Sequence, residues 1–588
     1  MKYLTLIIGL IVVFGFYGFA QEEEEDFEKD VIIVKPYEPA ISDAYKYSTQ
    51  PKIEDTVRIP PSFDYTIESR KKEVDFDVEP IKAAKTVGEP LTKLYRGYIR
   101  LGYGNYFTPY AEIDYNALRS KNYLFGVTGK HISSGGKLKL VDDENVFSGY
   151  NDNKLGIYAK GFYNNSTVSG NLNYISSRVY YYGFDERYLN DIEPGRDRED
   201  IDNNTYNILD FNARYRSNYT DSLHFNYDIN LDCYNIQHND DNIFDANMLS
   251  VTGDINKFIN YKKNILGSEF GISYYDQGRS FRFKTVYDTV KQYTVIKFDP
   301  YAGIIGDDWG IRVGLNTFVA YTDDNDPVFR FYPQASAQYN MVGNFLIPYF
   351  GITGDYMVND FRSVLQENKF IEPRLAVYRS DYRIFSYGGI KGNFSPEMQY
   401  DVKVTYAKID DMYFYVNNTE NYGVLGAKDI YLMNNFVVVY DDIEYLDFFG
   451  ELDFKYSKKL GFMLKADYSI YTMTNEFRPW HVPDYEVVFG AKYNLRNKIL
   501  VNALIYHIGG QSVKSWNPGG IEDYIELDGT IDVSLGIEYR YSKILSAFID
   551  LNNIASQNYY RWHNYPTQGF NFIAGITYSL LGEKSSVN

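Results

Sequence analysis

The segment Ile531-Asp-Val-Ser-Leu-Gly-Ile-Glu-Tyr-Arg-Tyr541 decides the fold, because its apolar and polar residues alternate without interruption. In an extended chain one face would carry the apolar set and the other the polar or small set: Ile531, Val533, Leu535, Ile537, Tyr539 and Tyr541 against Asp532, Ser534, Gly536, Glu538 and Arg540. A helix would mix these two sets, whereas a β-strand separates them. We therefore expect a strand that lies between an apolar and a polar medium.

The same alternation recurs from about Tyr95 to about Leu581. It is clear at residues 462–470, where Lys465 and Asp467 keep to one face, and again at 570–580, where Asn571, Thr577 and Ser579 do. A lysine or arginine facing lipid at the middle of a membrane costs about 2–4 kcal/mol, which explains this separation. The pattern predicts membrane-spanning strands.

The connections between these segments alternate in length. We expect short turns at 119–121, 217–221, 261–263, 342–344, 457–459, 495–498 and 541–543, and long loops at 134–152, 184–204, 277–289, 358–382, 412–433, 510–523 and 554–567. Alternating short and long connections are typical of an antiparallel up-and-down barrel with short periplasmic turns. This parity predicts an all-β transmembrane barrel of about 22 strands, within a range of roughly 16 to 24. It requires that 434–456 form one long strand with an irregularity near Asp441 and Asp442.

The N-terminal residues predict an exported protein. Lys2, the apolar run 4–19 and the small residue Ala20 are typical of a signal peptide, so we expect residues 1–20 to be removed and the mature chain to begin at Gln21. The barrel would occupy 95–582, followed by a C-terminal tail at 583–588. The barrel would lie in the outer membrane of a bacterium, with both the N-terminal tail and the C-terminus in the periplasm.

Residues 21–94 differ from the rest of the chain. They contain seven of the 19 prolines and 18 acidic against 11 basic residues, a local net charge of −7. Proline removes a backbone donor and charge resists burial, so this stretch is expected to be a largely irregular periplasmic tail.

Overall composition supports the barrel and excludes other classes. The 61 tyrosines and an aromatic fraction of 18% suit the aromatic girdles of membrane barrels. A net charge of −19 argues against nucleic acid as a partner, because phosphate neutralisation needs a basic face. Cys233 is the single cysteine, so an intramolecular disulfide is excluded.

The C-terminal hairpin resembles a known family. Residues 550–554 (Asp-Leu-Asn-Asn-Ile), 558–560 (Asn-Tyr-Tyr) and the strand 569–580 look like the last hairpin of TonB-dependent receptors of the outer membrane. The resemblance implies a 22-stranded barrel and uptake of a ligand. The same features also fit the closing strand of any outer-membrane barrel.

The chain departs from that family before the barrel. TonB-dependent receptors carry a globular plug, and a folded domain usually needs about 100–150 residues. The 74 residues 21–94 are therefore too short and too rich in proline for a complete plug. Asp30, Val31, Ile32, Ile33 and Val34 could serve as the short box that pairs with TonB by strand addition, or as a plain tail segment.

No pattern indicates catalysis or a resident metal. The six histidines are scattered without metal-ligand spacing, and no nucleophile elbow or phosphate loop occurs, so we expect no enzyme, no catalytic residue and no cofactor. Acidic loop residues near 191–202 and 240–245 are better explained as solvated loops than as calcium sites. Aromatic residues in the late loops are candidates for ligand contact, or for an outer girdle: Trp480, Trp516, Tyr559, Tyr560 and Trp562.

Three functions follow from this sequence. The first is a receptor or transporter similar to TonB-dependent receptors, with an unknown ligand. The second is a structural or accessory barrel within an outer-membrane assembly, and the third is a passive pore without a plug. The expected partners are outer-membrane lipids, the barrel-assembly machinery during insertion, and TonB or other envelope proteins.

Overall fold

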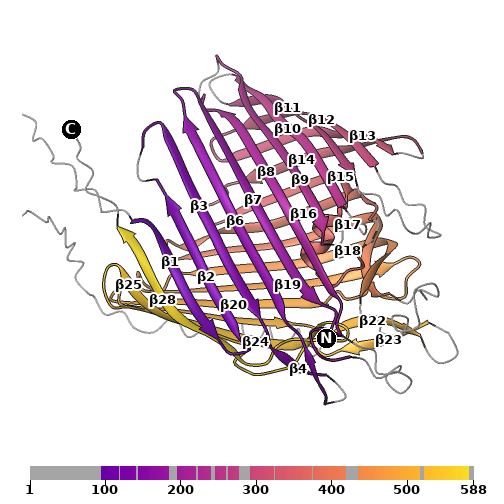
Figure 1. Cartoon of the computed structure of the whole chain (residues 1–588). Helices are drawn as coiled ribbons and strands as arrows, with labels where there is room; N and C mark the ends of the chain where they lie inside the picture. The colour runs from indigo at the N-terminus through magenta and orange to yellow at the C-terminus, as the bar shows by residue number, and fades with distance from the viewer. Residues whose placement is uncertain are drawn as a thin grey trace, which may run out of the picture. The chain divides into compact units, whose positions relative to one another are not determined.

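The structure is a computed structural model, and it describes residues 95–117, 120–140, 143–183, 195–219, 223–239, 245–259, 263–276, 292–322, 325–373, 375, 377–418, 435–516 and 522–581. Within these residues 22 antiparallel strands form one closed barrel, in which β1 (Tyr95–Gly104) pairs with β28 (Asn571–Leu581) (Figure 1). The predicted fold class and strand number are confirmed. The expected signal peptide, the tail 21–94 and the C-terminal tail lie outside the described residues.

Each barrel strand pairs with its neighbour in chain order. Between β1 and β28 the strands are β2 (Thr108–Asn116), β3 (Tyr123–Ser134), β6 (Tyr150–Phe162), β7 (Ser166–Tyr180), β8 (Asn203–Ser217), β9 (Asn226–His238), β10 (Asp245–Ile259), β11 (Asn264–Asp276), β12 (Gln292–Ile305), β13 (Trp309–Thr322), β14 (Asn325–Tyr339), β15 (Ile347–Val358), β16 (Arg379–Ser395), β17 (Met398–Asn417), β18 (Phe436–Phe454), β19 (Leu460–Met473), β20 (Tyr485–Leu495), β21 (Ile499–Ile508), β24 (Thr530–Arg540) and β25 (Leu545–Asn552).

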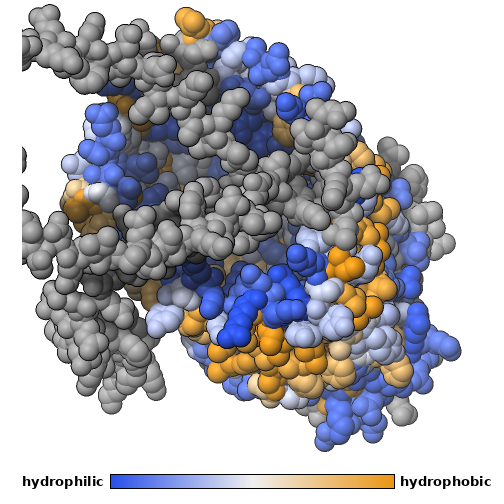
Figure 2. Space-filling view, turned by 90° about the vertical axis from the view of Figure 1, so that its left-hand side faces the viewer, coloured by the Kyte–Doolittle hydropathy of each residue, from blue (hydrophilic) through white to orange (hydrophobic). Residues whose placement is uncertain are grey.

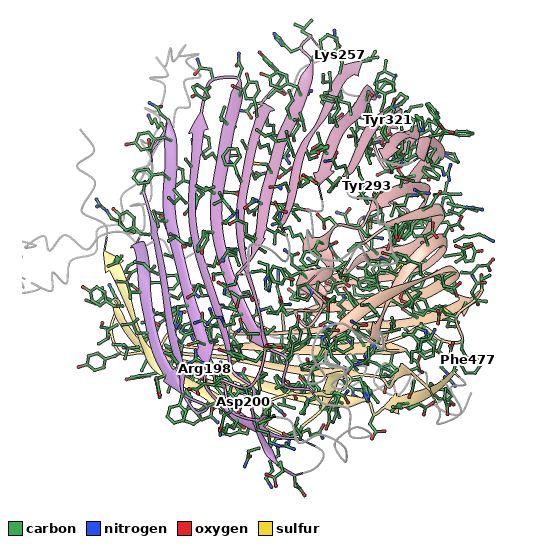
Figure 3. All side chains as sticks on the ribbon, turned by 45° about the vertical axis from the view of Figure 1, so that its right-hand side comes forward. Arg198, Asp200, Lys257, Tyr293, Tyr321 and Phe477 are labelled. Atoms are coloured by element: carbon green, nitrogen blue, oxygen red, sulfur yellow. The ribbon has the colours of Figure 1, made fainter. Side chains whose placement is uncertain are left out.

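The two ends of the barrel differ as the alternation predicts, with two exceptions. One end, here the short-turn end, carries short turns and both ends of the barrel chain. The other, the long-loop end, lies at the lower right of Figure 1. The exceptions are that only a few residues join β1 to β2 and β13 to β14 at the long-loop end. In Figure 3 Lys257 lies near the short-turn end, and Arg198 and Phe477 lie toward the long-loop end. The long connections contain the hairpins β4 (Lys137–Lys139) with β5 (Asn145–Phe147), β22 (Gln511–Trp516) with β23 (Glu522–Leu527), and β26 (Tyr560–Trp562) with β27 (Tyr565–Pro566), and the helix α2 (Phe361–Glu367).

Strand β13 illustrates the two faces of the wall. Its outward side chains run from Trp309 through exposed aliphatic residues to Tyr321, so an aromatic ring marks each end of the apolar stripe. Twelve residue steps span about 40 Å along a strand and about 28 Å across the membrane at a tilt of roughly 45°. This height matches the apolar band of about 25 Å typical of outer-membrane barrels. Figure 2 shows the same separation, with hydrophobic residues on the outer flank and hydrophilic residues around the hollow.

The closing strands approach each other closely. A side chain at Gly575 of β28 would place its Cβ 1.9 Å from the carbonyl oxygen of Leu101, so glycine is required where β1 and β28 meet. On the lumen side Arg100 of β1 reaches across β28 and donates to Asp550 of β25 at 2.7 Å. Its guanidinium also lies 3.7 Å from the ring centroid of Phe548. The first strand is thus fixed to both last strands.

The long strand expected at 434–456 is present as β18. Its pairing with β17 shifts register between Ile409 and Met412, opposite Asp441 and Ile443, so the predicted irregularity is confirmed. Asp441 is buried there and accepts hydrogen bonds from the backbone N–H groups of residues 474–476 in the next long connection. The irregularity therefore holds a loop in place.

We predict that Val313→Arg destabilises the barrel by about 2–4 kcal/mol, because Val313 is 51% exposed in the middle of the lipid-facing stripe of β13. The free energy of unfolding by urea in lipid vesicles measures the change. Ser336→Arg on the lumen side of β14 is the matched control, since an arginine there stays hydrated. Equal losses in both variants would contradict the assigned faces.

Candidate functional site

A segment between β15 and β16 enters the barrel at its long-loop end. We call residues 359–378 the cross-lumen segment; residues 374 and 376 of it are not described. Asp360 begins α2, because its carboxylate accepts the backbone N–H of Ser363 at 2.8 Å. The helix then buries Phe361, Val364 and Leu365. A short helix with one buried face needs a surface to cover, and the inner wall of the barrel supplies it.

One side of the cross-lumen segment contacts strands from the first half of the barrel. Phe361 packs against Tyr206 of β8, with ring centroids 5.4 Å apart. Arg362 donates to both carboxylate oxygens of Asp210 on β8, at 3.1 and 3.2 Å. The hydroxyl of Tyr234 on β9 donates to Asp360 at 2.5 Å.

Further along, the segment is tied to β6. The ammonium of Lys369 lies 2.9 Å from each carboxylate oxygen of Asp152. Both side chains are partly exposed, so this ion pair contributes about 0–1 kcal/mol and serves mainly to fix the position of the segment.

The other side of the segment contacts strands from the second half. Glu367 accepts hydrogen bonds from Tyr413 and Tyr415 of β17, at 2.9 and 2.7 Å. The backbone of Phe436 on β18 pairs with the segment, accepting the N–H of Glu372 at 2.8 Å and donating to the carbonyl of Phe370 at 3.0 Å. Around the ring of 22 strands, β8 is the sixth and β18 the sixteenth, ten strands apart. The segment therefore spans the lumen.

A third connection completes the packing. Tyr565 of β27 stacks on Phe370, with ring centroids 3.8 Å apart, and Trp562 of β26 packs against Tyr415 and Phe436 at 5.0 and 5.5 Å. We call the buried side chains that share this core the mouth cluster: Tyr181, Tyr206, Ile208, Tyr234, Ile236, Ala246, Phe361, Val364, Leu365, Ile371, Leu375, Val377, Tyr415, Phe436, Trp562 and Tyr565. Apolar side chains thus fill the centre of the long-loop end.

His481 lies against this cluster, in the connection between β19 and β20. It is 3% exposed, and its Nδ1–H donates to the carbonyl of Tyr415 at 2.8 Å. The other ring nitrogen, Nε2, accepts the backbone N–H of His563 at 3.4 Å. A carbonyl can only accept, so these partners require the neutral Nδ1–H tautomer. Burial lowers the pKa of His481 to about 3.

The β22–β23 hairpin is fastened beside the mouth cluster. Trp480 is fully buried and its indole N–H donates to Glu476 at 2.7 Å. Lys514 of β22 forms an ion pair with the same carboxylate at 2.6 Å, and both partners are largely buried. The backbone N–H of His481 donates to the carbonyl of Ser512 at 2.9 Å. The hairpin and the β19–β20 connection therefore form one unit.

The candidate ligand-contact residues take different places. Trp562 is buried in the mouth cluster and Trp480 in a neighbouring cluster, while Tyr559 is half-buried and donates to Asp532 at 2.9 Å. Tyr560 begins β26 and is partly buried, and Trp516 ends β22 with its side chain outside the described part. The pentad Asp30–Val34 also lies outside it. The structure thus brings Trp562 into the packed mouth, and contact of these five residues with a ligand stays a prediction.

Sequence reasoning missed the cross-lumen segment. Its signal was present in the loop expected at 358–382, where Asp360 precedes apolar residues at helical spacing, Phe361, Val364 and Leu365. An amphipathic turn inside an external loop indicates a loop with a core to cover.

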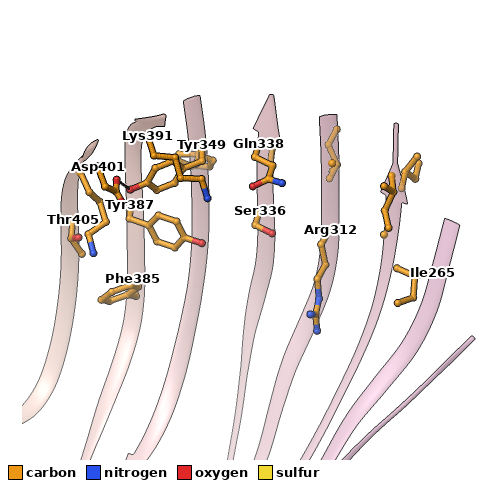
Figure 4. A pocket seen from close by; sticks show the side chains of 18 residues that line it. Ile265, Arg312, Ser336, Gln338, Tyr349, Phe385, Tyr387, Lys391, Asp401 and Thr405 are labelled. Atoms are coloured by element: carbon orange, nitrogen blue, oxygen red, sulfur yellow. Dashed lines mark hydrogen bonds between the residues drawn. The ribbon is translucent and has the colours of Figure 1, made fainter. Parts of the chain in front are cut away.

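A trough lies on the inner wall nearer the short-turn end, and Figure 4 shows the side chains that line it. It has a volume of about 610 Å³ and spans strands β11 to β17. Its polar residues include Arg312, which donates to Glu269 at 2.6 Å, and Tyr349, which donates to Asp401 at 2.5 Å. Its side chains carry both donors and acceptors: Arg312, Ser336, Gln338, Tyr349, Tyr387, Lys391, Asp401, Lys403 and Thr405. Such a wall suits water and polar solutes.

Two kinds of feature are missing from the described residues. Among them, no group of three or more histidine, cysteine, aspartate and glutamate side chains is arranged to hold a metal ion. No helix in this part of the chain is long and apolar enough to cross a membrane.

Comparison with known proteins gives matches in structure but not in sequence. No family model matches the chain, and no curated protein matches it. The ferripyoverdine receptor of the outer membrane of Pseudomonas aeruginosa, bound to ferripyoverdine, is similar with a TM-score of 0.59 at 12% identity, over 83% of this chain and 72% of that chain. The ferric-catecholate import receptor Fiu from K12 E. coli matches at 0.57 and 10%, over 83% and 82%. The copper transporter OprC matches at 0.58 and 10%, over 83% of each chain.

These structural neighbours are TonB-dependent receptors. The resemblance seen in the C-terminal hairpin is therefore confirmed for the barrel. Identities of 10–12% show a shared fold.

We predict that His481→Asn reduces the loss of stability in acid. The folded protein holds His481 neutral down to about pH 3, whereas the unfolded chain takes up a proton below about 6.5, so acid favours unfolding. Stability from this group is complete above pH 6.5 and falls by about 1.4 kcal/mol per pH unit below it. Asparagine keeps a donor for Tyr415 and tolerates the φ of 55° at this position.

Urea unfolding in vesicles at a series of pH values from 7.5 to about 4 measures the difference between the wild type and this variant. The free energy of unfolding should fall more steeply with falling pH in the wild type than in the variant. A difference that does not change with pH would contradict the assignment.

Proposed function

We propose that this protein is an outer-membrane receptor or transporter of the TonB-dependent-receptor type, with its long loops outside the cell and both termini in the periplasm. One observation carries the proposal: a closed 22-stranded barrel with a polar inner wall is crossed at its mouth by its own segment. A barrel that closes its own mouth is suited to controlled rather than free passage. The structural neighbours with this barrel are described as receptors and a transporter.

The inner wall supports passage of a polar ligand. Ion pairs and hydrogen-bonded carboxylates line it over much of its height, among them Arg100 with Asp550, Lys297 with Asp299, and Arg312 with Glu269. Paired charges keep the wall hydrated while leaving little net field to trap an ion.

The mouth cluster argues against a passive pore. A barrel of this width would hold a water-filled lumen if nothing occupied it. Here the cross-lumen segment contacts β6, β8 and β9 on one side and β17 and β18 on the other. Passage requires that this segment move.

An accessory role is the second candidate. Trp480 and Trp562 are buried among the protein's own side chains, so the mouth presents less free aromatic surface than a ligand site built on them would need. A rigid, self-packed mouth suits a barrel that holds partner proteins. The two roles differ in which proteins copurify with the chain.

We predict that TonB copurifies with the protein from mild detergent and that Ile32→Pro abolishes its recovery. Proline removes a backbone donor in the middle of Asp30–Val34, and strand addition depends on backbone hydrogen bonds. Ser42→Pro in the same tail is the control and should leave recovery unchanged. A stoichiometric complex with other envelope proteins and without TonB would instead support the accessory role.

We predict that replacing residues 360–377 by a short Gly-Ser linker opens the barrel to ions. Conductance in planar bilayers should be small for the wild type and large for the variant, because the variant lacks the segment that crosses the lumen. Replacement of the β4–β5 hairpin by the same linker is the control and should leave conductance low. A wild type that conducts as well as the variant would show that the mouth is open.

A further inference from the structure

In the barrel wall, β14 and β15 pair with each other over only part of their length. Their ladder contains only four pairs, Ala335–Gln338 with Tyr349–Ile352. Toward the long-loop end β14 continues to pair with β13, and β15 continues to pair with β16, but the two strands do not pair with each other. Residues 328–334 of β14 and 353–358 of β15 thus lie next to each other without a ladder between them. We call these two stretches the seam.

Side chains close the seam where backbone hydrogen bonds do not. Asp381 of β16 accepts from the hydroxyl of Tyr332 at 2.6 Å and from Arg330 at 2.7 Å, and both donors belong to β14. Asn316 of β13 donates to the carbonyl of Gly354 on β15 at 2.9 Å. A Cβ at Gly354 would lie 2.5 Å from the ring of Tyr332, so glycine leaves room for this ring across the joint.

An apolar cluster lies on the lumen side of the seam. Val295, Phe318, Ala320, Tyr332 and Tyr356 form a buried cluster there, flanked by Val328 and Val358. All of these residues belong to barrel strands, so the patch is part of the wall and not of the loops that fill the mouth. It interrupts a wall that is otherwise lined by ion pairs and amides at this level, including Lys297 with Asp299.

The lumen-side patch also contains an unsatisfied polar group. Tyr356 is only 4% exposed, and its hydroxyl has no hydrogen-bond partner among the described residues. A buried hydroxyl without a hydrogen-bond partner destabilises the fold. It would be relieved by a ligand that brings a polar atom to the seam.

The lipid side of the seam is aromatic and exposed. Phe329 and Phe331 of β14 are 68% and 73% exposed on the outer face. Pro333, which has no N–H to offer a partner, pairs with Leu315 about halfway along the apolar stripe of β13. The seam therefore occupies the half of the apolar band nearer the long-loop end.

We propose that the seam is a lateral portal for the hydrocarbon chain of an amphiphile, leading between the barrel lumen and the membrane. The apolar patch inside and the lipid-facing aromatic surface outside lie on the two faces of the same joint, which is closed by the Tyr332 ring, the bonds to Asp381 and the bond from Asn316 to Gly354. A hydrocarbon chain is the occupant that both apolar surfaces accept, and its polar head would meet the Tyr356 hydroxyl and the Arg330–Asp381 pair. Opening the portal costs side-chain contacts and leaves the barrel ladders intact.

The portal goes beyond the proposed receptor function, since it depends on neither TonB nor the ligand of that function. With the proposed orientation of the barrel the seam faces the outer leaflet of the membrane, and only this placement rests on the proposed function.

Fluorescence quenching by brominated lipid tests the portal on the full chain. Cys233→Ser provides a background without cysteine, and Val328→Cys then places a small fluorophore on the lumen side of the seam. Gln338→Cys is the matched control, on the same face of β14 where the ladder with β15 is intact. In vesicles with brominated acyl chains, the label at 328 should lose most of its fluorescence and the label at 338 little.

A double variant tests the closure of the seam with the same two labels. Tyr332→Phe with Asp381→Ala removes the hydrogen bonds between β14 and residue 381, and quenching at 328 should increase while quenching at 338 does not change. Equal weak quenching at both sites, with or without these substitutions, would overturn the portal. So would protection of site 328 by a tightly copurifying protein strand, because the joint would then be a docking edge. The proposed function is tested separately, by conductance and by TonB recovery. A negative result in the quenching experiment would therefore overturn the portal and not the proposed function.

Discussion

The structure depends on one constraint: within hydrocarbon, every backbone N–H and C=O group needs a partner from the protein itself. An open sheet would leave two edges unpaired, so β1 must meet β28, and the ring closes at 22 strands. Closure in turn fixes which residues face lipid, because a shift of one residue would exchange the two faces of a strand. The glycine at 575 and the long reach of Arg100 both serve this single joint.

The carboxylates of the barrel lumen help to explain the many tyrosines, which the aromatic girdles alone do not. Inside the barrel, phenol hydroxyls repeatedly donate to carboxylates, as in Tyr301 with Asp254 and Tyr349 with Asp401. Glu112 accepts from two tyrosines, Tyr98 and Tyr110. A phenol satisfies a carboxylate without adding a charge, and its ring fills space against the wall. The high tyrosine content thus reflects an acid-rich lumen as well as two membrane interfaces.

The sequence predicted most of the wall and little of the mouth. Strict alternation at 531–541 places Ile531 toward lipid and Asp532 toward the lumen, and the structure agrees. Local period and turn spacing suffice for such residues. The mouth cluster joins residues far apart in the chain, such as Phe436 and Tyr565, and no local pattern connects them. Trp480 and Trp562 could not be distinguished from exposed loop aromatics, because a ring that is buried by other loops has the same sequence surroundings as one that is free.

The cross-lumen segment sets the order in which the molecule can be built. Its contacts reach back to Asp152 and forward to Tyr565, so nearly the whole chain must be present before the interior is complete. Contacts between such distant residues are slow to form. The interior is assembled from inside a wall that is sealed only when β28 joins β1, and the last loop to arrive, with Trp562 and Tyr565, immediately precedes that strand. The interior of this barrel is therefore packed before the ladder between β1 and β28 forms. A half-inserted chain would expose both its unpaired edge strand and its unpacked aromatic side chains to chaperones and proteases.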